Sequence, residues 1–299
     1  MIKSVTIIGT GLIGGSFGLA LKKRGFAGRI VGCDRAAVLE KARKKGVIDT
    51  GSTHPAEAAR GSSIILLATP IGAIIELIGR LGPGLPQGTL LVDAGSTKVE
   101  VLAHASKVLG KHVNRQFLAC HPMAGKEQSG IEFADPDLFQ GATWFVTPSP
   151  RQKIFEGLSG DLLEFVESIG ANIISIGAKE HDHLCAWISH VPQLLSTALA
   201  AALVEEFGEG APLWEAGGRA LREMTRISAS PYSMWRDVAL TNKKNIGDAL
   251  LAMEQRLAHI RENLGTRELA MEFERAHQLR KIPSKPSPRR WGGTEKASQ

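Results

Sequence analysis

The chain has 299 residues, which suggests two domains, and its 43% of hydrophobic residues can bury ordinary globular cores. Three cysteines lie far apart, the N-terminus leads directly into an apolar strand, and the longest apolar run, 194–204, is too short for a bilayer. We therefore expect no disulfide framework, signal peptide or membrane span, and a cytoplasmic location. The net charge of +6 owes much to the Pro-, Ser- and Lys/Arg-rich segment 283–299, predicted to be a disordered tail that does not bind nucleic acid.

The first predicted unit is a strand, a glycine-rich turn, a helix and a second strand. Residues 5–8 are apolar and mostly β-branched, residues 9–14 read G-T-G-L-I-G, and the strand at 29–33 ends on Asp34. The acid stands 20 residues after the third glycine. In this order the G-x-G-x-x-G pattern predicts a dinucleotide-binding site.

Each residue of the turn has a physical task. Gly9 permits the tight turn, Gly11 lets the backbone approach a pyrophosphate, and Gly14 lets the helix pack closely on the strand. The helix begins around Leu12 and Ile13, and its free N–H groups would face the phosphates.

Two further positions complete the predicted cofactor site. Asp34 can accept hydrogen bonds from both ribose hydroxyls and favours NAD, while Arg35 beside it leaves NADP open. Thr69 ends the strand at 63–68, at the edge of the sheet where the cofactor would lie.

The order of the remaining elements predicts an α/β domain followed by an all-α domain. Later strands are predicted at 63–68, 90–93, 116–119, 144–147 and 172–176, with helices between most of them. This alternation indicates a Rossmann-type, doubly wound parallel sheet over 1–178. Residues 179–282 show no convincing strand and form a helical domain, whose apolar face at 194–204 predicts a homodimer.

Polar groups at the carboxyl ends of the predicted strands indicate an active site. His121 follows an apolar strand and precedes Pro122, so its ring is held rigidly, and an unperturbed pKa near 6.5 suits a general base. Ser96 is placed to hydrogen-bond either His121 or the substrate. From position alone, a histidine that only caps the loop is the alternative.

The helical half offers a second polar cluster. The spacing from His181 to His190 on one helix does not suit a metal site, and we expect none. Arg226 could clamp a carboxylate with two hydrogen bonds, although position alone favours an ordinary surface arginine.

Together these segments resemble the prephenate/arogenate dehydrogenase family of tyrosine biosynthesis. The motifs that carry the resemblance are GTGLIGGS from Gly9, DAGSTK from Asp93, HPMAGKEQSG from His121, EHDHLCAWISHVP from Glu180 and REMTRISASPYSMW from Arg222. The resemblance covers nearly the whole chain up to Leu279. It implies a Rossmann domain, a helical dimerisation domain, and NAD(P)-dependent oxidative decarboxylation of prephenate or arogenate.

The resemblance also implies roles for single residues. His121 would take the proton of the ring hydroxyl as hydride leaves the same carbon, and Ser96 would orient His121 and that hydroxyl. Arg226 would bind a substrate carboxylate, and Glu127 would order the active-site loop.

Three further residues are expected at the substrate, namely His190, Gln193 and Glu223. Gln193 replaces the second histidine of the family's S-H-x-P-H motif, and Glu223 stands where an aspartate is common. Because an amide carbonyl can accept a hydrogen bond from an ammonium group, we expect arogenate to be used at least as well as prephenate.

Two other functions stay open at this point. A β-hydroxyacid dehydrogenase would, by resemblance, carry a catalytic lysine on the interdomain helix, where this chain has only Lys179, at the start. A non-catalytic, NAD-binding redox sensor would have no need of His121, Ser96 and Arg226 together.

Overall fold

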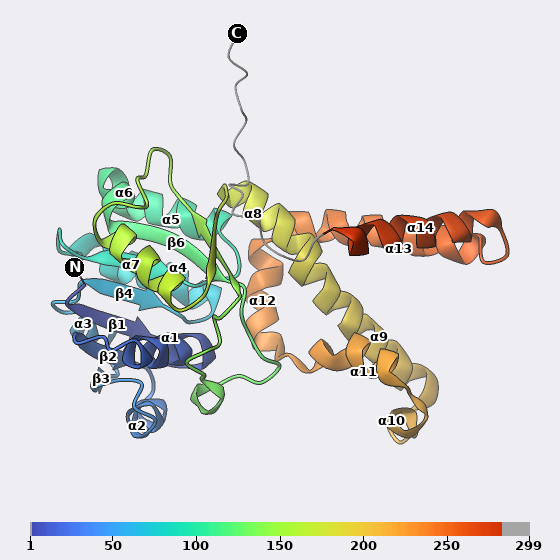
Figure 1. Ribbon diagram of the computed structural model, residues 1–299, viewed down its shortest axis with the longest axis horizontal. Helices are drawn as coiled ribbons and strands as arrows, with labels where there is room; N and C mark the ends of the chain where they lie inside the picture. Colours follow the sequence, from blue (N-terminus) through green and yellow to red (C-terminus); the bar gives the residue numbers. More distant parts are fainter. Residues whose placement is uncertain (1, 283–299) are drawn as a thin grey trace, which may run out of the picture.

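The computed structural model describes residues 2–282, and the predicted tail at 283–299 lies outside the described residues (Figure 1). An eight-stranded sheet forms the N-terminal domain, in the order β3-β2-β1-β4-β5-β6-β7-β8. The strands are β1 Ser4–Ile8, β2 Arg29–Cys33, β3 Thr50–Ser52, β4 Ile64–Leu67, β5 Leu90–Asp93, β6 Phe117–Pro122, β7 Thr143–Thr147 and β8 Asn172–Ser175.

One strand pair departs from the parallel arrangement that the sequence predicts. β6 and β7 are antiparallel, whereas the other neighbouring pairs are parallel. The connection between them carries only a short 3-10 turn, η3, at Ile131–Phe133. Parallel neighbours need a long, usually helical crossover, and antiparallel neighbours do not. The connection from β6 to β7, which has no crossover helix, therefore explains the exception.

Helices cover both faces of this sheet. They are α1 Leu12–Lys23, α2 Ala36–Lys44, α3 Pro55–Ala58, α4 Ile71–Leu81, α5 Val99–Leu109, α6 Val113–Gln116 and α7 Gly157–Ser168, with 3-10 turns η1 Gly82–Gly84 and η2 Gly110–His112. Alternate residues of β1 enter opposite cores, as expected for a strand buried on both faces. Ile7 joins the cluster around Phe17 of α1, and Ile8 joins the cluster around Ile74 of α4.

Helices make up the rest of the described chain. They are α8 Ala178–Cys185, the π-helical turn η4 Ala186–His190, α9 Val191–Phe207, α10 Leu213–Ala216, α11 Arg219–Thr225, η5 Arg226–Ala229, α12 Tyr232–Thr241, α13 Lys243–Glu262 and α14 Arg267–Lys281. α12 lies beside the sheet domain, and the hairpin of α13 and α14 projects away from it (Figure 1).

The helices α8, η4 and α9 run on as one helix, 178–207. The π-helical turn lies just before Pro192, which has no N–H to continue the α-helical ladder. This helix is long and apolar enough to cross a membrane by length and composition, with a mean hydropathy of 1.3 and 22% of its apolar window buried. The apolar run 194–204 was expected to be too short to span a bilayer. This expectation was wrong, because residues before 194 extend the same helix.

Candidate active site

The glycine-rich turn has the geometry that its sequence predicts. Gly9 has a φ of +91°, and a Cβ there would lie 2.5 Å from the Ala68 carbonyl oxygen. A Cβ on Gly14 would collide with the backbone of Gly9 and the side chain of Ile7. At Gly11 a Cβ would meet nothing within 4 Å, so the backbone there borders open space. The turn thus leaves its free side where a pyrophosphate would pass.

The groups around that space fit a dinucleotide. Gly11 is the N-cap of α1 and no side chain caps this helix end, so its first N–H groups stay available for phosphate. Asp34 is held in place because one carboxylate oxygen accepts the Thr10 N–H at 2.8 Å and the other accepts the N–H of exposed Arg35 at 2.8 Å. The Thr69 hydroxyl is buried without a hydrogen-bond partner in residues 2–282.

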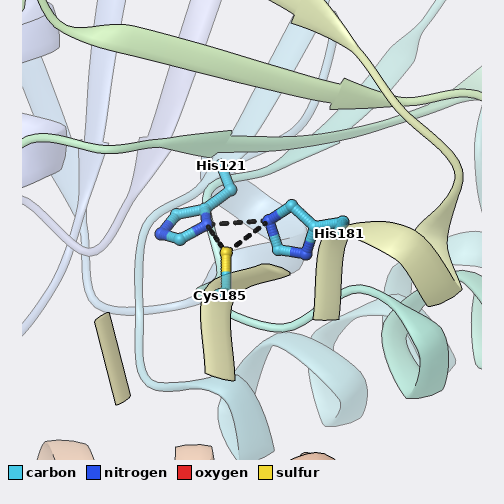
Figure 2. A group of neighbouring side chains, drawn as sticks. All are labelled: His121, His181 and Cys185. Atoms are coloured by element: carbon cyan, nitrogen blue, oxygen red, sulfur yellow. Dashed lines mark hydrogen bonds between the residues drawn. The ribbon is translucent and has the colours of Figure 1, made fainter. Parts of the chain in front are cut away.

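The predicted base, His121, lies at the end of β6 and is buried against the helical domain. Its Nδ1 lies 2.9 Å from Nε2 of His181 on α8, and both nitrogens lie near Sγ of Cys185, at 3.9 and 3.4 Å (Figure 2). The other ring nitrogen, Nε2 of His121, points away from these two partners (Figure 2). Each domain therefore contributes one histidine to a single contact.

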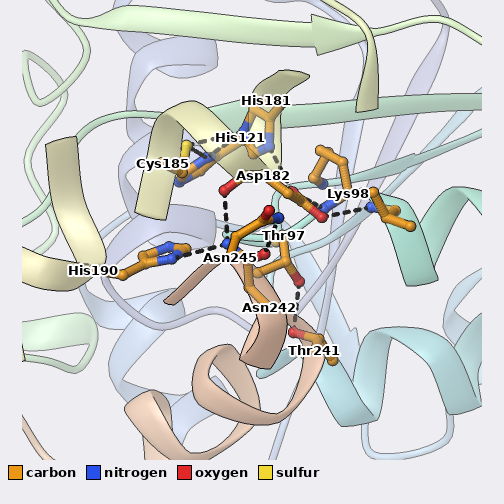
Figure 3. A network of polar contacts seen from close by, with 12 residues as sticks. Thr97, Lys98, His121, His181, Asp182, Cys185, His190, Thr241, Asn242 and Asn245 are labelled. Atoms are coloured by element: carbon orange, nitrogen blue, oxygen red, sulfur yellow. Dashed lines mark hydrogen bonds and ion pairs between the residues drawn. The ribbon is translucent and has the colours of Figure 1, made fainter. Parts of the chain in front are cut away.

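Behind His181 stands Asp182. Its Oδ1 lies 2.8 Å from Nδ1 of His181 and also accepts the Lys98 N–H at 2.7 Å. Its Oδ2 accepts the Val99 N–H at 2.9 Å, where α5 begins. The Asp182 backbone carbonyl accepts a hydrogen bond from Asn242 at 2.7 Å (Figure 3). The polar network thus ties α8 to α5 and to the junction of α12 and α13.

A buried ion pair supports the strand that carries His121. The Lys98 ammonium pairs with the Asp93 carboxylate, both side chains are fully buried, and the ammonium also donates to the Cys120 carbonyl at 2.6 Å. Cys120 immediately precedes His121, so a charge-assisted hydrogen bond fixes the backbone beside the base.

Burial changes the protonation of these histidines. It lowers the pKa of His121 well below 6.5, with added repulsion from His181, Lys98 and His190. Burial also lowers the pKa of His181, and it lowers that of His190 to about 4. The unperturbed pKa assumed from the sequence therefore does not apply, and the three rings are neutral at pH 7.

Two of the predicted substrate residues meet each other. Arg226 of η5 forms an ion pair with Glu127 of the loop after β6, and its side chain is 61% exposed. Glu223 lies elsewhere: it pairs with Arg219 on the outer face of α11, at 2.6 Å, with 61% of its side chain exposed. The placement of Glu223 at the substrate together with Gln193 therefore stays a prediction, and it requires the carboxylate to leave Arg219.

Gln193 and His190 are buried between the helices. The Gln193 side-chain amide donates to the Ile227 carbonyl at 2.8 Å and to the Thr197 hydroxyl at 3.3 Å, which leaves its carbonyl oxygen as an acceptor. His190 Nδ1 accepts from Asn242 at 3.2 Å, and its Nε2 has no partner in residues 2–282. Trp235 lies against the His190 ring, and its indole N–H is also unpaired in that range. These groups can bind a ligand.

Sequence reasoning missed the residues that hold His121. Nδ1 of His121 is paired with His181, and no hydrogen bond of Ser96 to His121 is seen in residues 2–282. The E-H-D-H motif on the first helix after the sheet was the available signal, since it places two histidines and an aspartate together where the two domains join. The donor atoms of His121, His181 and Cys185 lie within 4.8 Å of one another and could hold a metal ion. The separation between the two histidine nitrogens is equally that of a hydrogen bond.

Comparisons with known proteins agree with this geometry. The family model described as prephenate dehydrogenase, nucleotide-binding domain, matches residues 17–175, and that described as prephenate dehydrogenase, dimerization domain, matches 177–277. The chain is 35% identical to a prephenate dehydrogenase of Lactococcus lactis over 246 residues, which cover 81% of this chain and 65% of that one. It therefore spans slightly less than two thirds of that relative.

Solved structures give the same result. Prephenate dehydrogenase from Aquifex aeolicus in complex with hydroxyphenyl propionate and NAD+ superimposes with a TM-score of 0.82 at 29% identity, over 94% of this chain and 97% of that one. Synechocystis arogenate dehydrogenase superimposes with a TM-score of 0.73 at 25% identity, over 93% of this chain and 98% of that one.

Proposed function

Because the chain belongs to the prephenate dehydrogenase family, we propose that it catalyses the NAD-dependent oxidative decarboxylation of prephenate or arogenate. The observation that carries the proposal is the position of His121. It ends a strand of the nucleotide-binding sheet, at the edge that carries the glycine turn, and it meets the first helix of the second domain. A substrate between the domains would lie next to both the base and the cofactor.

The residues of this chain have distinct tasks in that reaction. NAD, when bound, accepts hydride from the ring carbon that bears the hydroxyl. His121 is neutral at pH 7 because burial lowers its pKa, so its free Nε2 can accept the hydroxyl proton. The Arg226 guanidinium can bind a substrate carboxylate in exchange for Glu127. Loss of the ring carboxylate as carbon dioxide then leaves a phenolate, which takes up one proton to give the phenol.

The preference between the keto acid side chain of prephenate and the amino acid side chain of arogenate depends on Gln193. Its amide donors are used by Ile227 and Thr197, so the side-chain carbonyl is the group it can offer. A carbonyl accepts from the ammonium group of arogenate, whereas the keto acid of prephenate offers no donor there. We therefore propose that arogenate is used at least as well as prephenate. One relative with a similar fold is an arogenate dehydrogenase.

Cofactor choice, assembly and location complete the proposal. Asp34 would repel a 2′-phosphate, which favours NAD over NADP, with Arg35 as the residue that could oppose this preference. The match to a dimerization domain supports a homodimer. Three free, buried cysteines support a cytoplasmic enzyme. We propose no metal and no nucleic-acid partner.

The test is the formation of NADH or NADPH with prephenate and with arogenate. His121→Asn should lower kcat by about two to four powers of ten, the usual contribution of a positioned general base, while substrate and NAD still bind. His183→Asn is the matched control, since His183 is exposed on the same helix as His181. An unchanged kcat in His121→Asn would exclude His121 as the general base. A higher kcat/KM with NADP than with NAD would refute the assignment of NAD as the cofactor.

A further inference from the structure

We infer that His181 and Asp182 fix the tautomer of His121, so that its proton sits on Nδ1 and its lone pair on Nε2. This makes His181 a positioning residue. The inference concerns how the base is prepared, and it rests on the proposed function only for its effect on turnover.

At Asp182 the hydrogen-bond donors are unambiguous. Backbone N–H groups can only donate, so the oxygens that face Lys98 and Val99 at 2.7 and 2.9 Å must accept. These N–H groups stand at the start of α5, where the helix dipole favours a negative charge. An ionised Asp182 also accepts from His181, whose Nδ1 lies 2.8 Å from Oδ1. The proton of neutral His181 is therefore on Nδ1.

The tautomer of His181 determines which ring nitrogen of His121 carries the proton. With its proton on Nδ1, neutral His181 presents the lone pair of Nε2 to His121 Nδ1, 2.9 Å away. Two lone pairs would repel each other at this distance, so His121 must supply the proton. His121 is neutral as well, and its lone pair is thus left on Nε2, the nitrogen that points away from His181 (Figure 2).

The other charged and titratable groups around His121 do not change this assignment of protons to His181 and His121. Cys185 is a neutral thiol because burial raises its pKa to about 12, and it can only add a weak donor to His181 Nε2 at 3.4 Å. The Lys98 ammonium is engaged by the Asp93 carboxylate and the Cys120 carbonyl. His190 is engaged by Asn242 (Figure 3). Phe145 packs against both His121 and His181 and offers no polar atom.

The arrangement also stabilises the protonated base. When a proton from the substrate hydroxyl binds Nε2, the Nδ1–H of the resulting imidazolium still donates to His181. The negative charge of Asp182 lies in line behind it. No proton needs to move from His121 to His181 or Asp182, so the only proton transferred is the one from the hydroxyl oxygen to Nε2 of His121, as hydride leaves the carbon that bears the hydroxyl. The same logic applies wherever a carboxylate orients a catalytic histidine.

A spectroscopic experiment tests the inference without relying on turnover. The sequence has nine histidines, so ¹⁵N-histidine labelling with long-range ¹H–¹⁵N correlation can resolve the tautomer of His121, which His121→Asn identifies. We expect the Nδ1–H form in the wild type and in Cys185→Ala. In His181→Leu, which removes the acceptor, we expect the Nε2–H form. In His181→Gln, whose amide oxygen can replace the acceptor, we expect the Nδ1–H form to return.

Kinetics supply the second readout. His181→Leu should lower kcat by roughly 100-fold with little change in KM, and His181→Gln should recover at least a tenth of the wild-type kcat. An Nε2–H tautomer in the wild type would overturn the inference even in an active enzyme. Loss of activity on chelation, with restoration by Zn²⁺, would also overturn it, because the cluster with Cys185 would then hold a metal. The expected tautomers in a protein inactive on both substrates would instead refute the proposed function.

Discussion

At the scale of single residues, burial sets the chemistry of His121 more than its intrinsic basicity does. The His121 residue is 7% exposed, and this burial holds its pKa well below 6.5. A base with a lowered pKa stays in its active, unprotonated form throughout the neutral range. It loses activity only when the pH falls below that lowered pKa.

The pH dependence of turnover follows from this shift. We expect the acid limb of the kcat/KM profile to lie below the ordinary histidine range, with activity nearly constant from pH 6.5 upward until another group titrates. Profiles with saturating NAD, recorded for the wild type and for His183→Asn, measure it. An acid limb centred above 6.5 would show that His121 gains rather than loses proton affinity in the protein.

Gln193 offers a second prediction at this scale. Gln193→His replaces a neutral acceptor with a ring that can donate and become cationic, so it should shift the ratio of kcat/KM values toward prephenate. One hydrogen bond to a charged group is worth about 1.5–3 kcal/mol, which corresponds to one to two powers of ten in that ratio. Gln152→His is the control, since the Gln152 amide bonds the Phe117 carbonyl at the first residue of β6 and not the residues around Gln193. A wild type that clearly prefers prephenate, with the ratio unchanged in the variant, contradicts the argument.

What the sequence could and could not predict at this scale has a physical cause. The tasks of Gly9, Gly11 and Gly14 depend on the conformation and packing of one short turn, so local spacing was enough to predict them. His181 contacts His121, which lies 60 residues earlier in the chain, and the spacing of apolar residues does not predict such a long-range contact. The exposed partner of Glu223 was equally invisible, because it depends on which face of α11 turns outward.

At the scale of elements, two carboxylates of the helical domain cap helices of the nucleotide-binding domain. Asp182 accepts the first N–H groups of α5, and Asp237 of α12 accepts the Gly72 N–H of α4 at 2.9 Å. Neither helix has a side-chain cap from its own N-cap residue. The cap residues belong to the partner domain, so docking of the domains satisfies both helix ends.

Removing one of these caps should loosen the docking. Burial raises the pKa of Asp237, but the Gly72 N–H and Arg236 outweigh it and keep the carboxylate ionised. Asp237→Ala should therefore cost about 1 kcal/mol of unfolding free energy, the typical value of a helix cap, measured by urea unfolding. Asp248→Ala, which removes only an exposed pair with Lys244, should cost less than half as much. Equal losses in the two variants would contradict a capping role.

Sequence patterns predict most of the helices and strands but not the direction of every strand. The strands other than β3, Thr50–Ser52, and most helices follow from apolar periodicity, whereas β3 has the sequence Thr-Gly-Ser and carries no apolar pattern. The antiparallel direction of β7 could not be read from its own residues. It depends on a loop that returns without a crossover helix, and strand periodicity is the same in both directions.

At the scale of the whole molecule, the helical domain exposes apolar surface that the described chain does not cover. Along the helix 178–207, exposed large hydrophobic side chains occur at Trp187, Ile188, Leu199, Val204 and Phe207. Such a helix either crosses a membrane or packs against another protein surface. The match of 177–277 to a dimerization domain favours a second copy of this chain.

The last prediction follows from that surface. We expect a homodimer of about 64 kDa at micromolar concentration, twice the 32.0 kDa of the chain, by light scattering. Val204→Glu would bury an unpaired charge in the interface and should shift the protein toward the monomer mass. Phe155→Glu, at an exposed position of the nucleotide-binding domain, should leave the mass unchanged. Flotation with phospholipid vesicles separates the alternatives: a wild-type monomer that floats with vesicles would assign this helix to a membrane, because the same apolar face cannot be buried in both places.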